Sequence, residues 1–381
     1  MKKFISMTVI FLLLVSSLCV PVRAAEFTEQ ISAKSAILMD AATGKVLFEY
    51  NADEALPPAS VTKVMTLLIV FEAIESGTLK LTDMISVSEN AASMGGTQIY
   101  LEVGEQMSAE DMIKSVVVSS ANDAACALAE HLCGSESSFV AKMNQRAAEL
   151  GMANTHFENT NGLDDTAENH VISARDIAIM SRELMKHEKI FDYTTIWMDT
   201  VRNGEFGLSN TNRLLRTYKG CTGLKTGSTS KAKFCISATA ERNGLSLIAV
   251  VMGAPTRDER NALAAKLLDF GFANYALYSE DQCAMEEIPL SGGVNATLKI
   301  RKEGYAALLE KEDIAGIEKE VELPESVAAP VKKGDVIGKI TYKCGGEVLG
   351  SANIVADEDG EKLGFFTLFA RILRHMVCSP E

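Results

Sequence analysis

The feature that most limits how this chain can fold is a pair of prolines followed at once by a helix-forming run. Pro57 and Pro58 end any strand or helix before them, because proline fixes φ and donates no N–H. The apolar spacing that follows predicts a helix over residues 63–74. Ser60 and Lys63 are three residues apart and share one helix face. An alcohol and an amine therefore lie side by side at the positive end of a helix dipole, an arrangement that favours a nucleophile with its own base.

This S-x-x-K pattern is weak by itself. The pairs Ser228/Lys231 and Ser230/Lys233 also match it by chance. A serine before a helix is also an ordinary N-cap, so a capped helix with no chemistry explains the stretch equally well. A catalytic reading needs support from other parts of the chain.

The first 24 residues have the pattern of a secretory signal peptide. Lys2 and Lys3 form a basic start, residues 9–15 are continuously apolar, and Val22-Arg23-Ala24 fits cleavage after Ala24. A retained membrane anchor is the alternative, although the apolar run is short for a membrane span. We expect an exported protein.

The mature chain is strongly acidic. Removing residues 1–24 takes away Lys2, Lys3 and Arg23 and no acidic residue, so the net charge of −14 becomes −17. Such a field disfavours nucleic acid as a partner. The length predicts two or three domains, and the 47% of hydrophobic residues is ordinary for a globular protein.

Cysteine usage indicates neither a disulfide framework nor a zinc site. The mature chain has an odd number of cysteines at irregular spacing and no C-x-x-C pair. Cys126 and Cys133 lie seven residues apart in an apolar helical segment and can face each other across two turns. We expect most of the thiols to be buried and free. They are Cys126, Cys133, Cys221, Cys235, Cys283, Cys344 and Cys378.

Local patterns predict alternating strands and helices up to about Tyr278. A hairpin is expected over 36–50, and a second one over 233–252 with its turn at Asn243-Gly244. Helices are expected over 112–131, with an interruption at 119–122, then over 137–150, from Ser173 to Leu184, and over 258–270 with Gly271 ending the last one.

The composition changes after that point. Residues 284–356 contain short strand-like runs separated by Gly, Pro and Lys turns, which predicts a small all-β module. Residues 363–377 are amphipathic with period 3.6, with phenylalanines on one face and Arg371 and Arg374 on the other. A basic, Phe-rich amphipathic helix favours the membrane interface. The alternative is a helix that docks on the protein's own surface.

Three stretches together carry the chemistry. They are Ser60/Lys63, then Ser120-Ala121-Asn122 at the break in the helical segment, then Lys225-Thr226-Gly227 before the strongest strand pair. Ser88-Glu89-Asn90 and Ser351-Ala352-Asn353 also match S-x-N, whereas Lys-Thr-Gly occurs once. What is specific is that all three motifs occur in this order along the chain, and that each lies in a suitable predicted local structure.

With these motifs the chain resembles the penicillin-recognising serine enzymes, which share S-x-x-K, S-D-N and K-T-G. It is most similar to the low-molecular-mass D-alanyl-D-alanine carboxypeptidases, with Ser-Ala-Asn as the middle motif. The stretches 39–44, 57–65, 98–100, 161–164 and 223–240 carry the same resemblance. Ser228 stands where some relatives have His, which leaves the pH optimum and the deacylation rate open.

The resemblance implies an α/β (α+β) penicillin-binding fold with an antiparallel sheet and a helical subdomain. The expected domains are a signal peptide over 1–24, a catalytic domain over 25–280, a β-rich domain over 284–356 and an anchoring helix over 362–378. It implies a serine-type D-Ala-D-Ala carboxypeptidase that trims peptidoglycan pentapeptides, binds β-lactams, needs no cofactor or metal, and contacts the membrane surface.

The resemblance also implies roles for individual residues. Ser60 is the nucleophile, Lys63 its base, and Ser120 a proton relay to the leaving amine. Asn122 orients the substrate amide, and Gly227 lets the substrate backbone lie against the strand. Lys225 and Thr226 receive the terminal carboxylate. The Ser60 N–H is one oxyanion donor, and the second is expected near Ser230 to Lys231.

Other readings remain at this stage. A β-lactamase has the same reactive residues but needs a deacylating glutamate, for which Glu158 and Glu168 are the candidates. A catalytically inactive peptidoglycan-binding protein is a second alternative. A Ser-His-Asp hydrolase lacks its G-x-S-x-G, and a zinc carboxypeptidase lacks H-E-x-x-H. The histidines are expected at the surface or at helix ends; they are His131, His156, His170, His187 and His375.

Overall fold

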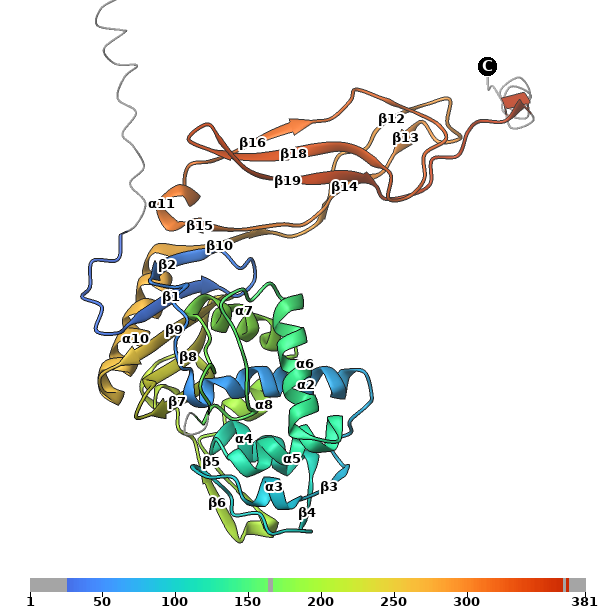
Figure 1. Ribbon diagram of the computed structural model, residues 1–381. Helices are drawn as coiled ribbons and strands as arrows, with labels where there is room; N and C mark the ends of the chain where they lie inside the picture. The colour runs from blue at the N-terminus through green and yellow to red at the C-terminus, as the bar shows by residue number, and fades with distance from the viewer. Residues whose placement is uncertain (1–25, 164–166, 366–367, 370–381) are drawn as a thin grey trace, which may run out of the picture.

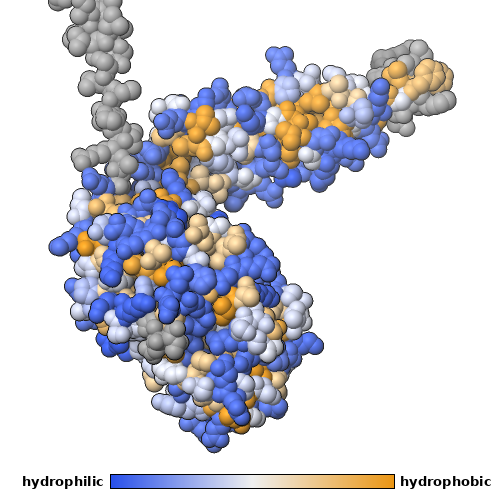
Figure 2. All heavy atoms as spheres, viewed as in Figure 1, coloured by the Kyte–Doolittle hydropathy of each residue, from blue (hydrophilic) through white to orange (hydrophobic). Residues whose placement is uncertain are grey.

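The computed structural model describes residues 26–163, 167–365 and 368–369. Figure 1 shows a body of helices packed on a sheet, and an arm of long strands that leaves one end of the body. Figure 2 shows hydrophilic residues intermixed with intermediate and hydrophobic ones on the visible face of the body. The expected signal peptide lies outside the described residues, as does most of the expected C-terminal helix.

The body is built on a five-stranded antiparallel sheet with strand order β2-β1-β9-β8-β7. Its strands are β1 (Ser35–Asp40), β2 (Val46–Tyr50), β7 (Cys221–Thr229), β8 (Lys233–Arg242) and β9 (Leu245–Ala254). Both predicted hairpins are confirmed, and Asn243 and Gly244 have the positive φ values that a tight two-residue turn requires. Strand β7 is one edge of the sheet, so its outer backbone groups are available for pairing.

Helices cover both faces of this sheet. One face packs against α10 (Arg257–Asn274), and the other faces α7 (Ala174–Met185) and α2 (Lys63–Glu75). The prediction that Gly271 ends the last helix is wrong, because α10 continues to Asn274. A Cβ at Gly271 would lie 2.5 Å from a methyl of Leu247. This glycine therefore allows the helix to pack closely on β9 and is not a stop signal.

A helical subdomain supplies the other side of the body. Its main helices are α4 (Ala109–Val118), α5 (Asn122–Cys133) and α6 (Glu136–Glu149). The predicted interruption between α4 and α5 is confirmed, and Ser120 there has a φ of 66°. Ser173 caps α7, as expected. Ser108 and Ser135 also cap helices with their side chains, and α4 and α6 begin at Ala109 and Glu136, slightly before the expected starts at 112 and 137.

Short elements connect these parts. They are η1 (Ala59–Thr62), β3 (Met84–Ser86), α3 (Glu89–Ala92), β4 (Gln106–Ser108), η2 (Glu188–Ile190), α8 (Phe191–Thr194), β5 (Met198–Val201), η3 (Arg202–Gly204), β6 (Phe206–Ser209) and α9 (Leu214–Thr217).

The arm is all-β apart from one helical turn, as predicted. Its largest sheet has the order β11-β14-β19-β18-β16 and is antiparallel. A separate apolar core that includes Leu298, Tyr342 and Ile354 holds it together. Its elements are β10 (Tyr275–Glu280), β11 (Cys283–Ala284), β12 (Ile288–Ser291), β13 (Thr297–Leu298), β14 (Ile300–Lys302), β15 (Tyr305–Glu310), α11 (Lys311–Ile314), β16 (Ile317–Glu322), β17 (Val327–Ala328), β18 (Val336–Cys344) and β19 (Glu347–Ala356).

Strand β10 joins the body to the arm. It follows α10 directly and pairs along its whole length with β15. Leu308 of β15 also packs into the apolar cluster beneath α10. The boundary expected between residues 280 and 284 stays a prediction. Within the described residues, no helix is long and apolar enough to cross a membrane.

The cysteines differ in part from expectation. All six described cysteines are free, Cys126 and Cys133 included. Cys126 and Cys235 are buried, three others are half-buried, and Cys283 is exposed, so the prediction that most thiols are buried is wrong for this part of the chain. Burial raises the pKa of the Cys235 thiol to about 11, so this group is a neutral packing element at neutral pH.

Candidate active site

Ser60 and Lys63 meet at the start of α2, as their spacing predicts. Ser60 lies in the short turn η1, and Lys63 is the first residue of α2. The Lys63 Nζ lies 2.8 Å from the Ser60 Oγ. Ser60 is half-buried and Lys63 is fully buried. The alcohol therefore reaches the surface of a cavity while the amine stays beneath it.

Three oxygens surround the Lys63 amine. Besides Ser60, they are the Asn122 Oδ1 at 2.6 Å and the backbone oxygen of Asn161 at 2.9 Å. Burial, and then the nearby charge of Lys225, lower the pKa of Lys63 well below its usual range. A neutral amine has two N–H groups and one lone pair. Because both carbonyl oxygens can only accept, they take the two N–H groups, and the lone pair remains for the Ser60 hydroxyl.

Ser120 and Lys225 form a second pair next to the first. The Lys225 Nζ donates to the Ser120 Oγ at 2.8 Å and to the Thr226 backbone oxygen at 3.0 Å. Burial, and then the charge of Arg260, lower the pKa of Lys225 to about 7. The left-handed backbone of Ser120 turns its side chain out of the helical segment towards β7.

Asn122 lies deeper than the sequence suggested. Its Oδ1 accepts from Lys63, and its Nδ2 donates to the Gly95 backbone oxygen at 2.7 Å. The side chain is buried and does not line the cavity beside Ser60. In this structure Asn122 positions the Lys63 amine, and its expected contact with substrate stays a prediction.

Thr226 and Gly227 lie on β7, facing the start of α2. The Thr226 hydroxyl donates to the Thr211 Oγ1 at 2.7 Å. A Cβ at Gly227 would lie 2.8 Å from the Ser60 backbone N and 2.9 Å from the Val61 backbone N. Glycine is therefore required here because the backbone of Ser60 and Val61 lies against the strand. The expected contact of Gly227 with a substrate stays a prediction.

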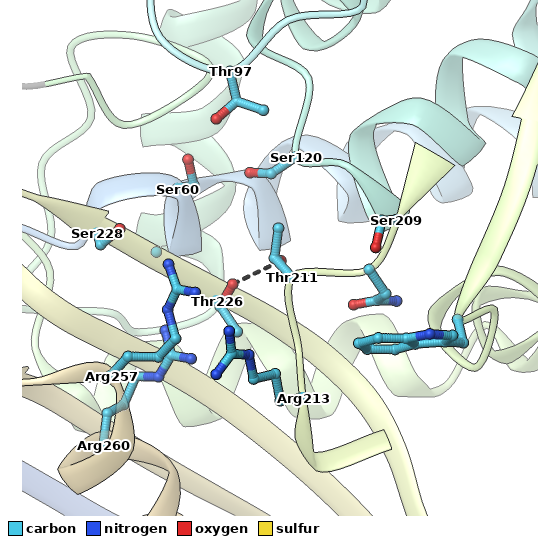
Figure 3. A pocket seen from close by; sticks show the side chains of 13 residues that line it. Ser60, Thr97, Ser120, Ser209, Thr211, Arg213, Thr226, Ser228, Arg257 and Arg260 are labelled. Carbon is cyan, nitrogen blue, oxygen red and sulfur yellow. Dashed lines mark hydrogen bonds between the residues drawn. The ribbon is translucent and has the colours of Figure 1, made fainter. Parts of the chain in front are cut away.

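A cavity of about 470 Å³ opens between these elements (Figure 3). Four of the predicted site residues line it, namely Ser60, Ser120, Thr226 and Gly227, whereas Lys63, Asn122 and Lys225 lie behind its surface. Ser228, singled out in the sequence as a departure from some relatives, also lines it. The other lining residues were missed by the sequence reasoning. They are Thr97, Trp197, Ser209, Asn210, Thr211, Arg213, Arg257 and Arg260. Arg257 and Arg260 could have been noticed in the sequence, because positively charged residues are unusual in the first turn of a helix.

The expected position of the second oxyanion donor is not supported. Ser230 and Lys231 lie in the turn between β7 and β8, and neither lines the cavity. Ser228, next to Gly227 on β7, does line it. Glu158 and Glu168, the candidates for a deacylating glutamate, are exposed and line a different pocket.

One histidine is placed differently from the expectation. His170 is buried, with its Nε2 2.8 Å from the Thr62 Oγ1 and its ring against Phe157. Its Nδ1 accepts from the Glu158 backbone N–H. His170 thus holds the loop around residues 157–163 against η1, and no described histidine lines the cavity.

Buried Asp123, also missed from the sequence, holds the loop at the cavity's far wall. Its carboxylate accepts from the backbone N–H groups of Ile99 and Leu101. The neighbouring Asn122 backbone N–H donates to the Thr97 oxygen at 2.7 Å. Loop 97–101 is therefore fastened to the start of α5, and this places Thr97 in the cavity wall.

Two family models and several named proteins match this chain. Residues 22–256 match the peptidase S11 family, D-alanyl-D-alanine carboxypeptidase, and residues 272–362 match the C-terminal domain of penicillin-binding protein 5. D-alanyl-D-alanine carboxypeptidase DacF of Bacillus subtilis is 43% identical over 90% of this chain and 89% of its own length.

Two solved structures extend the comparison. Penicillin-binding protein 5 of Haemophilus influenzae superimposes with a TM-score of 0.73 and 32% identity, over 88% of this chain and 100% of that one. Penicillin-binding protein D2 of Listeria monocytogenes, solved in an ampicillin-bound form, has a TM-score of 0.60 and 32% identity, over 65% of this chain and 100% of its own.

Proposed function

Since this chain belongs to the peptidase S11 family of D-alanyl-D-alanine carboxypeptidases, we propose that it performs their serine-type hydrolysis with Ser60 as the nucleophile. The observation that carries this assignment is the environment of Lys63. Two carbonyl oxygens take both N–H groups of the neutral amine, so its lone pair faces the Ser60 hydroxyl at 2.8 Å. That is the geometry of a general base next to its nucleophile.

In the proposed acylation, the Ser60 Oγ attacks the carbonyl carbon between the last two D-alanines. The new O–C bond forms as the proton of Ser60 moves to Lys63. The C–N bond then breaks, and the leaving amine takes a proton through Ser120, whose hydroxyl lines the same cavity and accepts from Lys225. Water afterwards cleaves the ester, its hydroxyl staying on the stem peptide and its hydrogen returning to Ser60.

We assign the oxyanion donors to the backbone N–H groups of Ser60 and Ser228. The support is positional, because Gly227 packs directly on the Ser60 backbone and Ser228 is the next residue of β7 in the cavity wall. Two fixed N–H groups on opposite sides of a carbonyl oxygen stabilise the charge that develops there.

The terminal carboxylate of the substrate is assigned to Lys225 and Thr226, with the Thr211 hydroxyl next to them. Thr226 and Thr211 already share a hydrogen bond at the cavity surface, and the substrate accepts from both once it is bound. Lys225 supplies a positive charge beneath them, and an arriving carboxylate favours its protonated form. Asn122 is assigned a positioning role through Lys63.

The test uses a short peptide that ends in Lys-D-Ala-D-Ala. We expect the purified protein to release D-alanine and Ser60→Ala to release none. Ser230→Ala is the matched control, because Ser230 begins another S-x-x-K but lies outside the cavity. A wild-type protein that binds the peptide without releasing D-alanine would instead be a peptidoglycan-binding module.

β-Lactam binding follows from the same site, since a relative was solved with ampicillin bound. We expect a penicillin to add its mass to the wild-type chain at the peptide that contains Ser60, and to add none to Ser60→Ala. Slow release of the adduct distinguishes this enzyme from a β-lactamase, because Glu158 and Glu168 face another pocket.

We further propose an exported enzyme held at the outer face of the cytoplasmic membrane, with residues 1–24 as signal peptide and 362–378 as surface anchor. The support is the amphipathic pattern of residues 363–377. The last described residues also lie at the end of the arm away from the body (Figure 1). Deleting residues 362–381 should release the protein from membranes, whereas a truncated form that still pellets with them would exclude this anchor.

A further inference from the structure

The amine of Lys63 is covered on one side by the loop of residues 157–163. The backbone oxygen of Asn161 in this loop accepts from Lys63 at 2.9 Å, and Asn161 is only 2% exposed. On the outer side of the loop, Glu158, Asn161 and Leu163 line a surface pocket of about 630 Å³. The loop is therefore a thin layer between a buried amine and a pocket at the surface, and the contacts that hold this layer also decide the surroundings of the amine.

His170 joins this loop to the turn that leads into α2. It is 4% exposed, and its Nε2 lies 2.8 Å from the Thr62 Oγ1. Its Nδ1 lies 3.0 Å from the Glu158 backbone N, which can only donate. Nδ1 is therefore the acceptor, and Nε2 carries the hydrogen and donates to Thr62. A neutral imidazole thus connects the residue before Lys63 to the first part of the loop.

The imidazole is itself held firmly in place. Val171, the next residue, exchanges backbone hydrogen bonds with His156. The Phe157 ring packs edge-on against the His170 ring, with 5.8 Å between the ring centres. His170 is thus fixed by backbone pairing and by packing, and it can act as a rigid support for the loop.

Other contacts keep the loop attached to the helices around it. Asn144 and Glu136 of α6 both hydrogen-bond to the loop. On α2, the Thr66 hydroxyl donates to the Thr160 backbone oxygen at 2.6 Å. These contacts remain when His170 is replaced, so we expect the loop to shift and not to unfold.

We propose that His170 is a positioning residue for the general base, and that it acts through loop 157–163 by keeping the Asn161 oxygen on the Lys63 amine. The inference rests on the proposed function and leaves its chemistry unchanged. With that oxygen in place, two carbonyl oxygens take both N–H groups of the neutral amine, and the lone pair stays with Ser60. If the loop moves outwards, one N–H loses its acceptor and water from the surface pocket reaches the amine. Burial is the largest cause of the low pKa of Lys63, so water at the amine raises that pKa.

The charges that act on Lys63 lie on other elements. Lys225 of β7 lowers the pKa of Lys63, and Asp123 of α5 raises it. Neither residue belongs to the loop, so a change at His170 alters the burial of Lys63 and leaves these two charges in place.

The experiment compares His170→Leu with His170→Asn, using the D-Ala-D-Ala peptide. His170→Leu removes both ring hydrogen bonds, and we expect kcat/KM to fall by about 100-fold, because small displacements of a reacting group have effects of that order. In His170→Asn the Oδ1 stands where Nδ1 was and still accepts from the Glu158 N–H. We therefore expect this variant to be about tenfold more active than His170→Leu, the effect of one buried hydrogen bond.

The acid limb of the kcat/KM profile distinguishes positioning from a purely structural role. Rates are expressed per site that penicillin can acylate, so that unfolded protein does not count. In both variants the acid limb should move to higher pH, because a wetter Lys63 takes up its proton more readily. A purely structural role lowers the number of sites and leaves the limb where it is.

His187→Asn is the matched control. His187 is half-buried, contacts the Phe71 ring, and has its Nδ1 3.0 Å from a carboxylate oxygen of Glu75 at the other end of α2. The same substitution there should leave both the rate per site and the acid limb unchanged.

An acid limb that stays in place in His170→Leu would overturn the inference, and so would an equal shift in His187→Asn. A limb that moves to lower pH would show that His170 itself titrates in the wild type, and this would overturn it as well. A wild type that releases no D-alanine contradicts the proposed function. An active wild type with His170 variants of normal rate contradicts only the role of His170.

Discussion

At the scale of single residues, the site depends on two buried lysines held in different states. Burial is the largest cause of the lowered pKa of both lysines, but the groups that contact each amine differ. Lys63 meets two carbonyl oxygens and a hydroxyl, with Lys225 as the nearest cation. Lys225 meets a hydroxyl and a carbonyl oxygen, next to the cavity that we propose receives the substrate's carboxylate. The first is suited to act without its proton and the second with it.

The pH dependence of kcat/KM should therefore have two limbs. Activity falls at acid pH as Lys63 gains its proton, and falls at alkaline pH as Lys225 loses its own, with a midpoint near the pKa of about 7 in the free enzyme. Lys225→Arg keeps a charge at all these pH values, so its alkaline limb should move upwards or disappear. The measurement is kcat/KM against pH with the D-Ala-D-Ala peptide.

Lys231→Arg, on the exposed turn after β7, is the control and should leave the profile unchanged. An alkaline limb that stays in place in Lys225→Arg would show that another group titrates. The limb in kcat should lie higher than that in kcat/KM, because the bound carboxylate favours protonated Lys225.

At the scale of elements, Ser60 is held between a strand and a loop. Gly227 of β7 touches the backbone of Ser60 from one side. From another, Gly162 approaches so closely that a Cβ there would lie 1.9 Å from the Ala59 backbone oxygen. Ala59 itself has a φ of 49°, unusual for a residue with a side chain. The turn before Lys63 is thus shaped by neighbours from distant parts of the chain.

Gly162→Ala should disrupt this arrangement. Its φ of +86° is costly for alanine, and the added methyl has to displace the Ala59 backbone. We expect acylation by penicillin to slow by about 100-fold, because small displacements of a reacting group have effects of that order. The rate of adduct formation measures this directly.

Gly151→Ala is the matched control, since Gly151 has a φ of +72° and nothing within 4 Å of the added methyl. It should cost about 1 kcal/mol of stability from the left-handed backbone and leave acylation intact. Equal acylation rates in the two variants would mean that Gly162 matters only for its backbone conformation.

At the scale of the whole molecule, an ionic cluster lies where the arm begins. Glu280, the last residue of β10, accepts from Lys302 and Lys319 and from the hydroxyls of Tyr278 and Tyr342. Burial by itself raises the pKa of Glu280, but these hydrogen bonds outweigh it and lower the pKa to about 2. The cluster joins β10 to β14, β16 and β18, so the start of the arm is fastened to its main sheet.

The cluster predicts a dependence of stability on pH. The folded pKa of Glu280 lies below its ordinary value, so its contribution is complete above about pH 4.5 and is lost as the pH falls towards 2. Glu280→Gln should lower the free energy of unfolding of the arm by about 2 kcal/mol at pH 7 and have little effect near pH 2.

Glu322→Gln tests whether any carboxylate of the arm has this effect. Its partner Lys339 lies 3.8 Å away and both side chains are exposed, so we expect a change within about 0.5 kcal/mol. Denaturant unfolding at several pH values provides the measurement. A Glu280→Gln effect that persists unchanged at pH 2 would contradict the charge argument.

The arm should matter for access to the wall and little for the chemistry itself. A chain that ends at Asn274 lacks β10 and β15 but keeps the sheet and every lining residue of the Ser60 cavity. We expect it to release D-alanine from a soluble peptide at a rate close to wild type, and to lose activity on wall material next to a membrane. Unchanged activity on both substrates would exclude a spacing role for the arm.

The sequence alone was sufficient to predict the features that depend only on residues close together along the chain. Ser60 and Lys63 share a face because of their spacing, Ser173 caps a helix, and Asn243-Gly244 turns a hairpin, since each needs only local geometry. The order of the three motifs was enough to indicate the family. Even so, a local rule failed at Gly271, where packing on Leu247 decided the outcome.

Tertiary structure decided whatever depends on residues far apart in the chain. Asn161 lies 98 positions after Lys63 in the chain, yet its backbone oxygen accepts from the Lys63 amine. No spacing rule predicts this contact, which leaves the lone pair of the neutral amine for the Ser60 hydroxyl. Arg213 and Arg257 likewise reach one cavity only because α10 packs on β9 and β8, next to β7. Burial and long-range proximity set the charge states of this site, and both arise only once the chain has folded.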